Sequence, residues 1–233
     1  MGLGVSAKFR PDKDCELCGA RKKNVFCDLP PEGVKLLDQS KVVNYYKRGQ
    51  TVFYSGNFPA GLYCVNGGVV KLEAPSENGN GHILRVAQAG DMLGYRSLFA
   101  DESYQASAVV QEDATICLIP KSAVMQLVEK YPDIALQFLA RISRELRQAE
   151  DRFRSSVDKA APERIAEALL FLKENFADQA WTRKDIAEWA GTTPETVMRT
   201  LADFEEESLI AQKGRRIEIK DRKALLERAN LKL

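Results

Sequence analysis

The chain has few of the residue patterns on which common catalytic sites depend. Its 233 residues include one histidine, His82, which follows a glycine-rich stretch and is expected at the surface or at the end of a strand. The sequence contains no catalytic triad, no phosphate-binding P-loop and no dinucleotide-binding glycine fingerprint. These absences argue against an enzyme.

Long apolar runs and a strong net charge are also missing. No segment is long enough to span a bilayer and no signal peptide opens the chain, so we expect a cytoplasmic protein without a membrane partner. The formal net charge is +1, and residues 159–233 carry 14 Lys and Arg against 14 Asp and Glu. Any binding to nucleic acid must therefore depend on local basic patches.

Two short segments near the C-terminus have the pattern of a helix-turn-helix. Thr182 is a good N-cap for an amphipathic helix that Gly191 closes. Thr193 is a second good N-cap, and Pro194 suits the first position of the helix that follows it. A helix, a glycine turn and a second capped helix are what a DNA-binding helix-turn-helix requires. The alternative is a surface helical hairpin inside another helical domain.

The second helix carries side chains that can read base pairs. Glu195 and Arg199 lie one turn apart near its N-terminus, where a carboxylate can accept from cytosine N4 and a guanidinium can bond guanine O6 and N7. Met198 has no polar group and is expected to pack on a thymine methyl. The residues expected to contact DNA are Thr182, Arg183, Thr193, Glu195, Thr196, Met198, Arg199, Arg215 and Arg216.

The segments around this motif complete a winged domain. Residues 162–176 predict a helix with one apolar stripe, and residues 208–219 predict a β-hairpin that turns at Gly214. Asp221 is expected to cap a last short helix. Upstream, residues 29–120 contain short alternating runs broken by glycine, which is typical of an antiparallel sandwich or jelly roll.

The segment after Pro132 predicts a dimerisation helix. Apolar residues recur there in steps of four and three, which is the heptad seam of a two-stranded coiled coil. The alternative is a helix packed on its own domain. A two-fold dimer would present two recognition helices to successive major grooves of a near-palindrome. The seam residues are Leu139, Ile142, Leu146, Ala149 and Phe153.

With these motifs, the chain resembles the Crp/Fnr family of bacterial transcription regulators over nearly its whole length. The resemblance rests on Arg183-Lys184-Asp185-Ile186-Ala187, on Glu195-Thr196-Val197-x-Arg199, on Leu209-Ile210 with the wing, and on the β-rich half. It implies an α+β protein with a cyclic-nucleotide-binding-like β-roll. It also implies a palindromic DNA site with a TGA-like half-site, and RNA polymerase as a partner.

The predicted organisation has four parts. A cysteine-bearing arm covers residues 1–28, and a β-roll sensor domain covers residues 29–130. A dimerisation helix at residues 131–158 leads to a winged helix-turn-helix DNA-binding domain at residues 159–233. We therefore expect a signal read by the β-roll to reach DNA through the long helix.

The resemblance does not extend to the usual cyclic-nucleotide contacts. In the cyclic-nucleotide branch of the family, a Glu binds the ribose and an Arg-Ser pair binds the phosphate. This chain has Tyr95 at the Glu position, Gln105 at the Arg position and Ala106 at the Ser position. A buried phosphate would lack its bidentate arginine partner, so cAMP is not expected as a ligand in the usual mode.

Cysteine usage favours a different signal. Cys15 and Cys18 have C-x-x-C spacing, and four thiolates suit a [4Fe–4S] cluster. The oxygen-sensing Fnr branch has cluster ligands at positions that correspond to Cys15, Cys18, Cys27 and Cys117. The resemblance therefore implies an iron–sulfur cluster and a response to oxygen or redox state. Cys64 is left over, and a small core residue is expected there.

Two departures from the Fnr pattern affect this expectation. Eight residues separate Cys18 from Cys27, which is more than in the Fnr pattern. Ala149 stands where Fnr has an acidic seam residue, so we expect a dimer that persists without a cluster. The alternatives are zinc on the same thiolates, a dithiol switch at Cys15 and Cys18, or no metal and an unidentified small molecule in the β-roll. The alternative from a different class of protein is an enzyme, a dithiol oxidoreductase that uses the C-x-x-C pair. The βαβ pattern that normally surrounds this motif is missing from the sequence.

Overall fold

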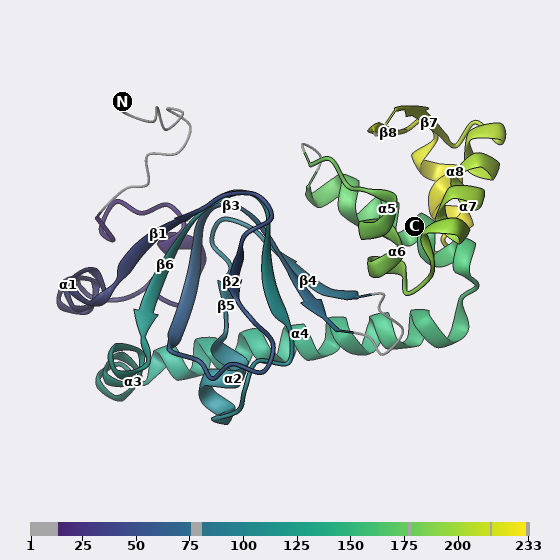
Figure 1. Cartoon of the computed structure of the whole chain (residues 1–233). Helices are drawn as coiled ribbons and strands as arrows, with labels where there is room; N and C mark the ends of the chain where they lie inside the picture. Colours follow the sequence, from purple (N-terminus) through teal and green to yellow (C-terminus); the bar gives the residue numbers. More distant parts are fainter. Residues whose placement is uncertain (1–13, 76–80, 177–178, 215, 232–233) are drawn as a thin grey trace, which may run out of the picture. The chain divides into compact units, whose positions relative to one another are not determined.

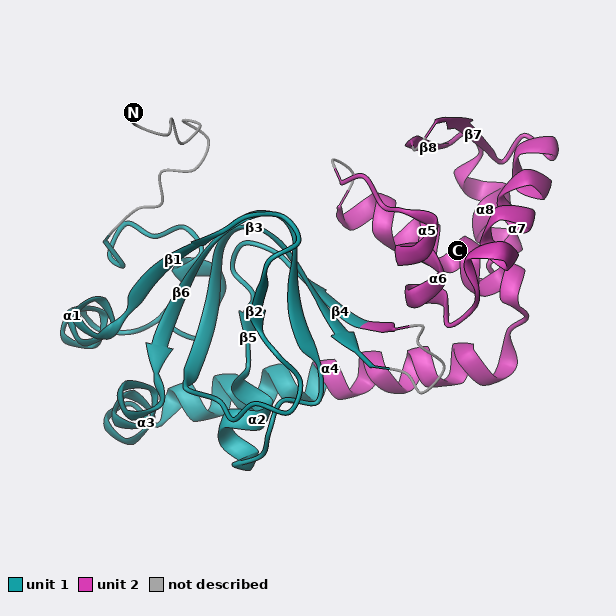
Figure 2. Cartoon of the chain, in the orientation of Figure 1, with its two compact units in different colours: residues 1–75, 84–144 teal, residues 76–83, 145–233 magenta. Residues whose placement is uncertain are grey.

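The protein is described here from a computed structural model that covers residues 14–75, 81–176, 179–214 and 216–231. Figure 1 shows its elements along the chain, and Figure 2 colours its two compact units. Unit 1 contains the described residues of 1–75 and 84–144, and unit 2 contains those of 76–83 and 145–233. Within the described ranges, no helix has the length and apolar character needed to cross a bilayer.

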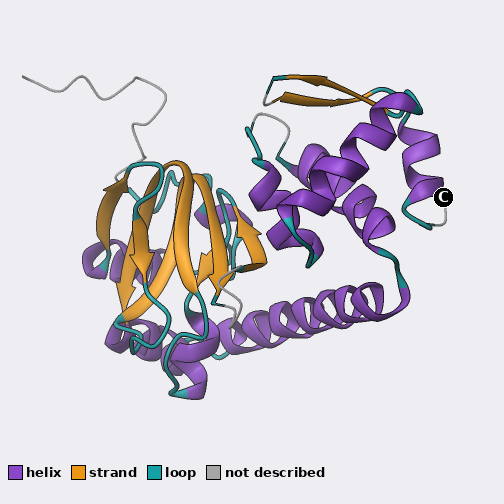
Figure 3. Cartoon of the chain, turned by 45° about the vertical axis from the view of Figure 1, so that its right-hand side comes forward, coloured by secondary structure: helices purple, strands orange, loops and turns teal. Residues whose placement is uncertain are grey.

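Unit 1 is the β-rich part of the chain. Figure 3 shows its strands in orange, running side by side. Its elements are η2 (Arg21–Lys23), α1 (Pro31–Ser40), β1 (Val42–Tyr46), β2 (Thr51–Phe53), β3 (Gly61–Ala74), most of β4 (His82–Ala87), β5 (Met92–Leu93), α2 (Tyr95–Ala100), β6 (Ser107–Pro120), α3 (Lys121–Lys130) and the first part of α4 (Asp133–Asp158).

The sheet is built around β3 and β6, which pair antiparallel over most of their length. Its strand order is β1-β6-β3-β4, with β2 added to β6 and β5 added to β3. Successive side chains of a strand point to opposite faces. Leu62 therefore joins one apolar cluster, while its neighbour Tyr63 joins another.

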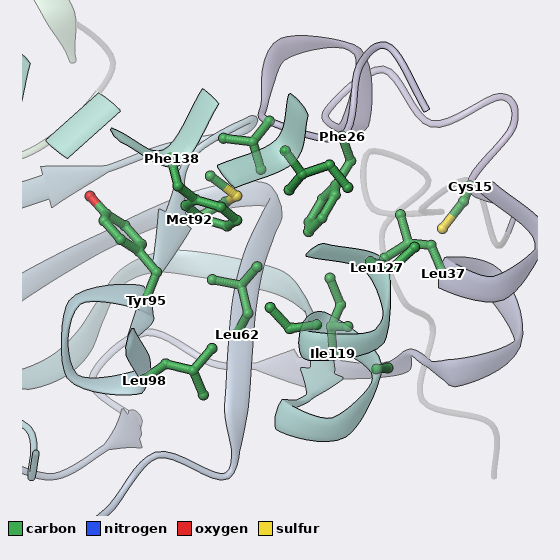
Figure 4. Close-up of a cluster of buried hydrophobic side chains, with 14 of the residues drawn as sticks. Cys15, Phe26, Leu37, Leu62, Met92, Tyr95, Leu98, Ile119, Leu127 and Phe138 are labelled. Atoms are coloured by element: carbon green, nitrogen blue, oxygen red, sulfur yellow. The ribbon is translucent and has the colours of Figure 1, made fainter. Parts of the chain in front are cut away.

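These two clusters form the core of unit 1. The first gathers Phe26 from the arm, Leu37 from α1, Leu127 from α3 and Phe138 from α4, and Figure 4 shows these side chains with their neighbours. The second contains Phe53, Tyr63 and Tyr104 with residues of β6. The predicted α+β fold with an N-terminal β-roll is confirmed.

Helix α1 was not expected from the alternating pattern of residues 29–120. It begins with Pro31 at a first-turn position and buries Val34 and Leu37 against the first cluster. Proline at a helix start and apolar residues three apart are local signals for this helix. The alternating runs that follow α1, which glycines interrupt, led to the prediction of strands for residues 29–120 as a whole.

Unit 2 carries the winged helix-turn-helix and the last part of α4. Thr182, Thr193 and Asp221 cap their helices through side-chain oxygens, as predicted. Gly191 and Gly214 adopt positive φ values at the two predicted turns, a conformation that glycine takes without strain. Its elements are α5 (Ala161–Asn175), α6 (Arg183–Ala190), α7 (Pro194–Glu206), β7 (Ile210–Lys213), β8 (Arg216–Ile219) and α8 (Arg222–Arg228).

Candidate functional site

Helix α7 has one buried face and one exposed face, as a recognition helix needs. Val197, Leu201 and Phe204 are buried in the domain, whereas Glu195 and Arg199 are exposed. Met198 is 54% exposed between them, which is unusual for a large apolar side chain and leaves it available for a base contact. The polar and apolar groups expected to read base edges therefore share one accessible face.

The N-terminus of α7 holds Glu195 as a carboxylate. Hydrogen bonds from its own backbone N–H and from the Thr193 side chain hold the pKa of Glu195 below its usual range. Thr193 also accepts from the Thr196 amide, at 3.3 Å. A carboxylate fixed in this way stays ionised at neutral pH and can accept from a base amino group.

Other predicted DNA contacts divide between structural and accessible positions. Arg183 Nη2 donates to Gln212 Oε1 at 2.6 Å and to the Gly214 carbonyl at 3.2 Å, so it joins the first helix to the wing. Thr182 is occupied as the N-cap of α6. Arg216 is exposed on β8, and Arg215 lies outside the described residues.

Helix α4 presents an exposed row of large apolar side chains. Leu146 is 59% exposed and Phe153 is 70% exposed in the single chain, and Leu139 and Ala149 are also exposed. Ile142 is partly buried against the first core cluster. Leu136 and Val157 extend the row by about one turn in each direction. Four of the five predicted seam residues therefore lie on an accessible face.

Four thiols line one cavity on the face of the sheet that the first core cluster covers. Cys15 and Cys18 come from the arm, Cys64 comes from β3, and Cys117 comes from β6. Lys41, which precedes β1, lines the same cavity. No three Cys, His, Asp or Glu side chains among the described residues are placed to hold a single metal ion.

Cys27, the fourth ligand suggested by the sequence, does not line this cavity. Its Sγ lies 3.2 Å from Asp28 Oδ2, and its side chain is partly exposed. The structure thus brings together three of the four predicted ligands, Cys15, Cys18 and Cys117, and places Cys64 beside them. The expected role of Cys64 as a plain core residue did not anticipate this arrangement.

Burial favours the protonated form of three of these thiols, Cys15, Cys64 and Cys117. It raises the pKa of Cys15, raises that of Cys64 strongly, and raises that of Cys117 to about 11. The nearby Lys41 ammonium opposes the shift at Cys15 and Cys117. The thiolate is the nucleophile in dithiol chemistry, and a reactive cysteine normally has a lowered pKa. The arrangement is therefore unlike that of a dithiol oxidoreductase.

Alkylation should distinguish Cys27 from the cavity thiols. In metal-free native protein at about pH 7.5, we expect iodoacetamide to modify Cys27 well before Cys117. Partial burial and Asp28 also raise the pKa of Cys27, but the pKa of Cys117 reaches about 11. That value leaves on the order of 100-fold less thiolate than an ordinary cysteine has, and the burial of Cys117 restricts access further. Peptide mass spectrometry over time would measure both rates, with denatured protein as the control in which they converge. Equal rates in the native protein would contradict the placement of the two thiols.

The opposite face of the sheet has a small pocket at the position of the usual nucleotide site. Tyr104 stacks on Phe53 there, with ring centroids 4.0 Å apart. Arg85, a partly buried cation that lines the pocket, donates to Tyr95 Oη at 3.0 Å and pairs with Asp91 at 3.3 Å. The pocket thus has aromatic rings and an arginine that is already paired, and the substitutions at residues 95, 105 and 106 leave it without the phosphate-binding pair.

Comparison with known proteins places both parts of the chain in one family. The profile of the cyclic nucleotide-binding domain matches residues 43–131, and that of the Crp-like helix-turn-helix domain matches residues 163–228. The fumarate and nitrate reduction regulatory protein of Escherichia coli (strain K12) is 29% identical over 192 residues, which cover 78% of this chain and 76% of that protein.

Two further relatives match a larger share of this chain. The CRP-like cAMP-activated global transcriptional regulator of Mycobacterium tuberculosis is 26% identical over 217 residues, or 89% of this chain and 97% of that protein. A solved Crp/Fnr-family regulator from Thermus thermophilus is 26% identical with a TM-score of 0.69, covering 81% of this chain and 98% of its own. The β-roll, the winged helix-turn-helix and these matches show that the chain belongs to the Crp/Fnr family of DNA-binding transcription regulators, which are not enzymes.

Proposed function

We propose that this regulator responds to oxygen or redox state through a cysteine-ligated iron–sulfur cluster. The observation that carries the proposal is the meeting of arm and sheet thiols, with Cys15 and Cys18 in the same cavity as Cys117. Thiolates are the protein ligands of iron–sulfur clusters. When bound, such a cluster supplies iron–thiolate bonds that oxygen can break.

Ligation of the thiols would couple the state of the cluster to the packing of the arm. Cys15 and Cys18 belong to residues 14–28, a segment with little regular structure, whereas Cys117 belongs to a long central strand. Ligation of both would fix the arm against the sheet, and Phe26 from the arm packs 6.3 Å from Phe138 of α4, measured between ring centroids. A change in ligation would therefore bear on the packing of α4 in unit 1.

The DNA-binding part of the proposal is a homodimer on a palindrome. The exposed apolar row on α4 would be covered by a second copy, as a two-stranded seam. Arg199 and Glu195 would then read a TGA-like half-site in each major groove, with Arg199 on guanine. RNA polymerase is the further partner that a transcription regulator of this type would contact.

Anaerobic purification tests the signal directly. We expect bound iron and sulfide, a visible absorbance that disappears in air, and a change in affinity for a duplex with two TGA-like half-sites. Because Ala149 puts no charge in the seam, the molecular mass from light scattering should stay that of a dimer after exposure to air. Iron-free wild-type protein after careful anaerobic reconstitution would contradict the proposal.

A further inference from the structure

We propose that Cys64, and not Cys27, is the fourth thiol of this centre. The set is then Cys15, Cys18, Cys64 and Cys117, with Lys41 as a buried counter-charge. The assignment rests on the proposed thiolate-ligated centre and names the residues that hold it. The ligand is a thiophilic metal centre, and the proposed function names an iron–sulfur cluster as that centre.

Strand register places Cys64 beside Cys117. The two residues are direct partners in the antiparallel pairing of β3 with β6, which puts their side chains on the same face of the sheet. Leu62 and Ile119, two residues away on each strand, belong to the cluster that covers this face, whereas Tyr63 and Val65 point into the other cluster. Cys64 therefore faces the arm and its two thiols.

The fold of the arm holds Cys15 at the cavity and turns Cys27 away. Arg21 Nε donates to the Cys15 carbonyl at 2.7 Å, and Arg21 Nη1 donates to the Phe26 carbonyl at 2.8 Å. The Cys15 amide donates to Asp38 Oδ1 at 2.9 Å. Phe26 is fully buried in the first core cluster. Bringing Cys27 to the cavity would require this loop to turn over and would remove the Phe26 ring from the core.

Four thiolates can hold either a single tetrahedral zinc or a cubane iron–sulfur cluster. Around a single tetrahedral zinc with bonds of about 2.3 Å, thiolate sulfurs stand about 3.8 Å apart. No group of three Cys, His, Asp or Glu side chains in the described ranges is placed for that. In a cubane cluster each thiolate binds a different iron, so the four sulfurs stand farther apart around a shared space. The cavity supplies four thiols, one for each iron of such a cluster.

Lys41 supplies positive charge where four thiolates would need it. Its side chain is only 6% exposed, and its ammonium donates to Cys15 Sγ at 3.1 Å and pairs with Asp38. A buried ammonium is costly unless anionic groups compensate it. One carboxylate is present, and thiolates in the cavity would add further negative charge, so Lys41 would stabilise a metal centre that carries a net negative charge.

Matched serine variants test the assignment. Wild-type protein, Cys27→Ser, Cys64→Ser and Cys117→Ser would be reconstituted anaerobically with ferrous iron and sulfide, and iron, sulfide and absorbance measured per chain. Serine is isosteric with cysteine but is a poor iron ligand, and thermal unfolding would show which variants fold. Cys64→Ala serves as a second variant at that position.

We expect Cys27→Ser to keep wild-type iron, and Cys64→Ser and Cys117→Ser to lose at least three quarters of it. Loss of iron in Cys27→Ser, or its retention in a folded Cys64 variant, overturns the assignment while leaving the proposed function intact. A parallel titration with zinc separates the two metal chemistries. Uptake of zinc alone, with dependence on Cys64, supports the thiol set and overturns iron-based sensing, whereas no uptake of either metal overturns both.

The rate of iron release to a chelator tests the role of Lys41 separately. Lys41→Met keeps the apolar stem but removes the charge, and the exposed Lys35→Met variant is its control. We expect Lys41→Met to release iron to an anaerobic chelator several-fold faster than wild-type protein, and Lys35→Met to match wild type. Equal release from all three proteins overturns the counter-charge role.

Discussion

Replacement of Leu146 with Asp should convert the protein from a dimer into a monomer in solution. Leu146 lies at the middle of the exposed row on α4, which would be buried in a two-fold dimer. An unpaired carboxylate in such a seam costs several kcal/mol, which raises the dimer dissociation constant on the order of 10²- to 10³-fold. Sedimentation or light scattering at micromolar concentration would measure the change.

The control for this variant is a charge on the same helix but outside the row. Gln148 is exposed and lies off the seam, so Gln148→Asp should remain a dimer of wild-type stability. Binding to a duplex with two half-sites should fall sharply in Leu146→Asp and remain unchanged in Gln148→Asp. A folded, dimeric Leu146→Asp protein would show that the interface lies elsewhere.

Substitution of Arg199 by Ala should weaken binding to one particular half-site sequence. A bidentate arginine–guanine contact contributes about 1–3 kcal/mol, so affinity for the TGA-like site should fall roughly 5- to 150-fold. Affinity for a duplex in which that G·C pair is changed should hardly fall. Fluorescence anisotropy with both duplexes at one salt concentration would measure the difference.

Arg222→Ala is a suitable control for the same loss of charge. Arg222 belongs to α8 and pairs with Glu174 at 2.6 Å, so its removal should leave sequence preference unchanged. An equal loss of affinity for every duplex in Arg199→Ala would instead assign Arg199 to phosphate contact, which carries no sequence information.

Local features of the sequence were sufficient to predict the winged domain. The caps at Thr182, Thr193 and Asp221 depend on bonds to residues within three positions, and the turns at Gly191 and Gly214 depend on a single backbone conformation. Such interactions appear in the sequence as short, fixed spacings. The exposed and buried faces of α7 followed from the same periodicity.

The thiol cavity could be predicted only in part. The C-x-x-C pair and Cys117 are identifiable by spacing and by resemblance, but the position of Cys64 depends on strand register. The register of β3 against β6 shifts after Val65, where bulges interrupt the alternation. Which residue of β6 faces Cys64 is therefore decided by pairing between strands far apart in the chain, and no local pattern carries that information.

The hydrogen bonds of Arg183 to the wing could not be predicted from the sequence either. A basic residue at the start of α6 is predicted to contact DNA, and its Nη2 atom also bonds to Gln212 and Gly214 of the wing. The hairpin folds back onto the helix start from a distant part of the chain. Charge alone does not show that a residue expected to contact DNA also bonds to the wing.

The central strands have a further consequence for how the two faces of the sheet can change over generations. Tyr63 and Val65 belong to the aromatic pocket side of β3, whereas Cys64 and Asn66 line the thiol cavity on the other side. Adjacent positions in the gene thus contribute to the thiol cavity on one face and to a core cluster on the other. Substitutions at residues 63 and 65 can therefore repack that cluster while residues 64 and 66 keep the thiol cavity, so the two faces of one sheet can change independently.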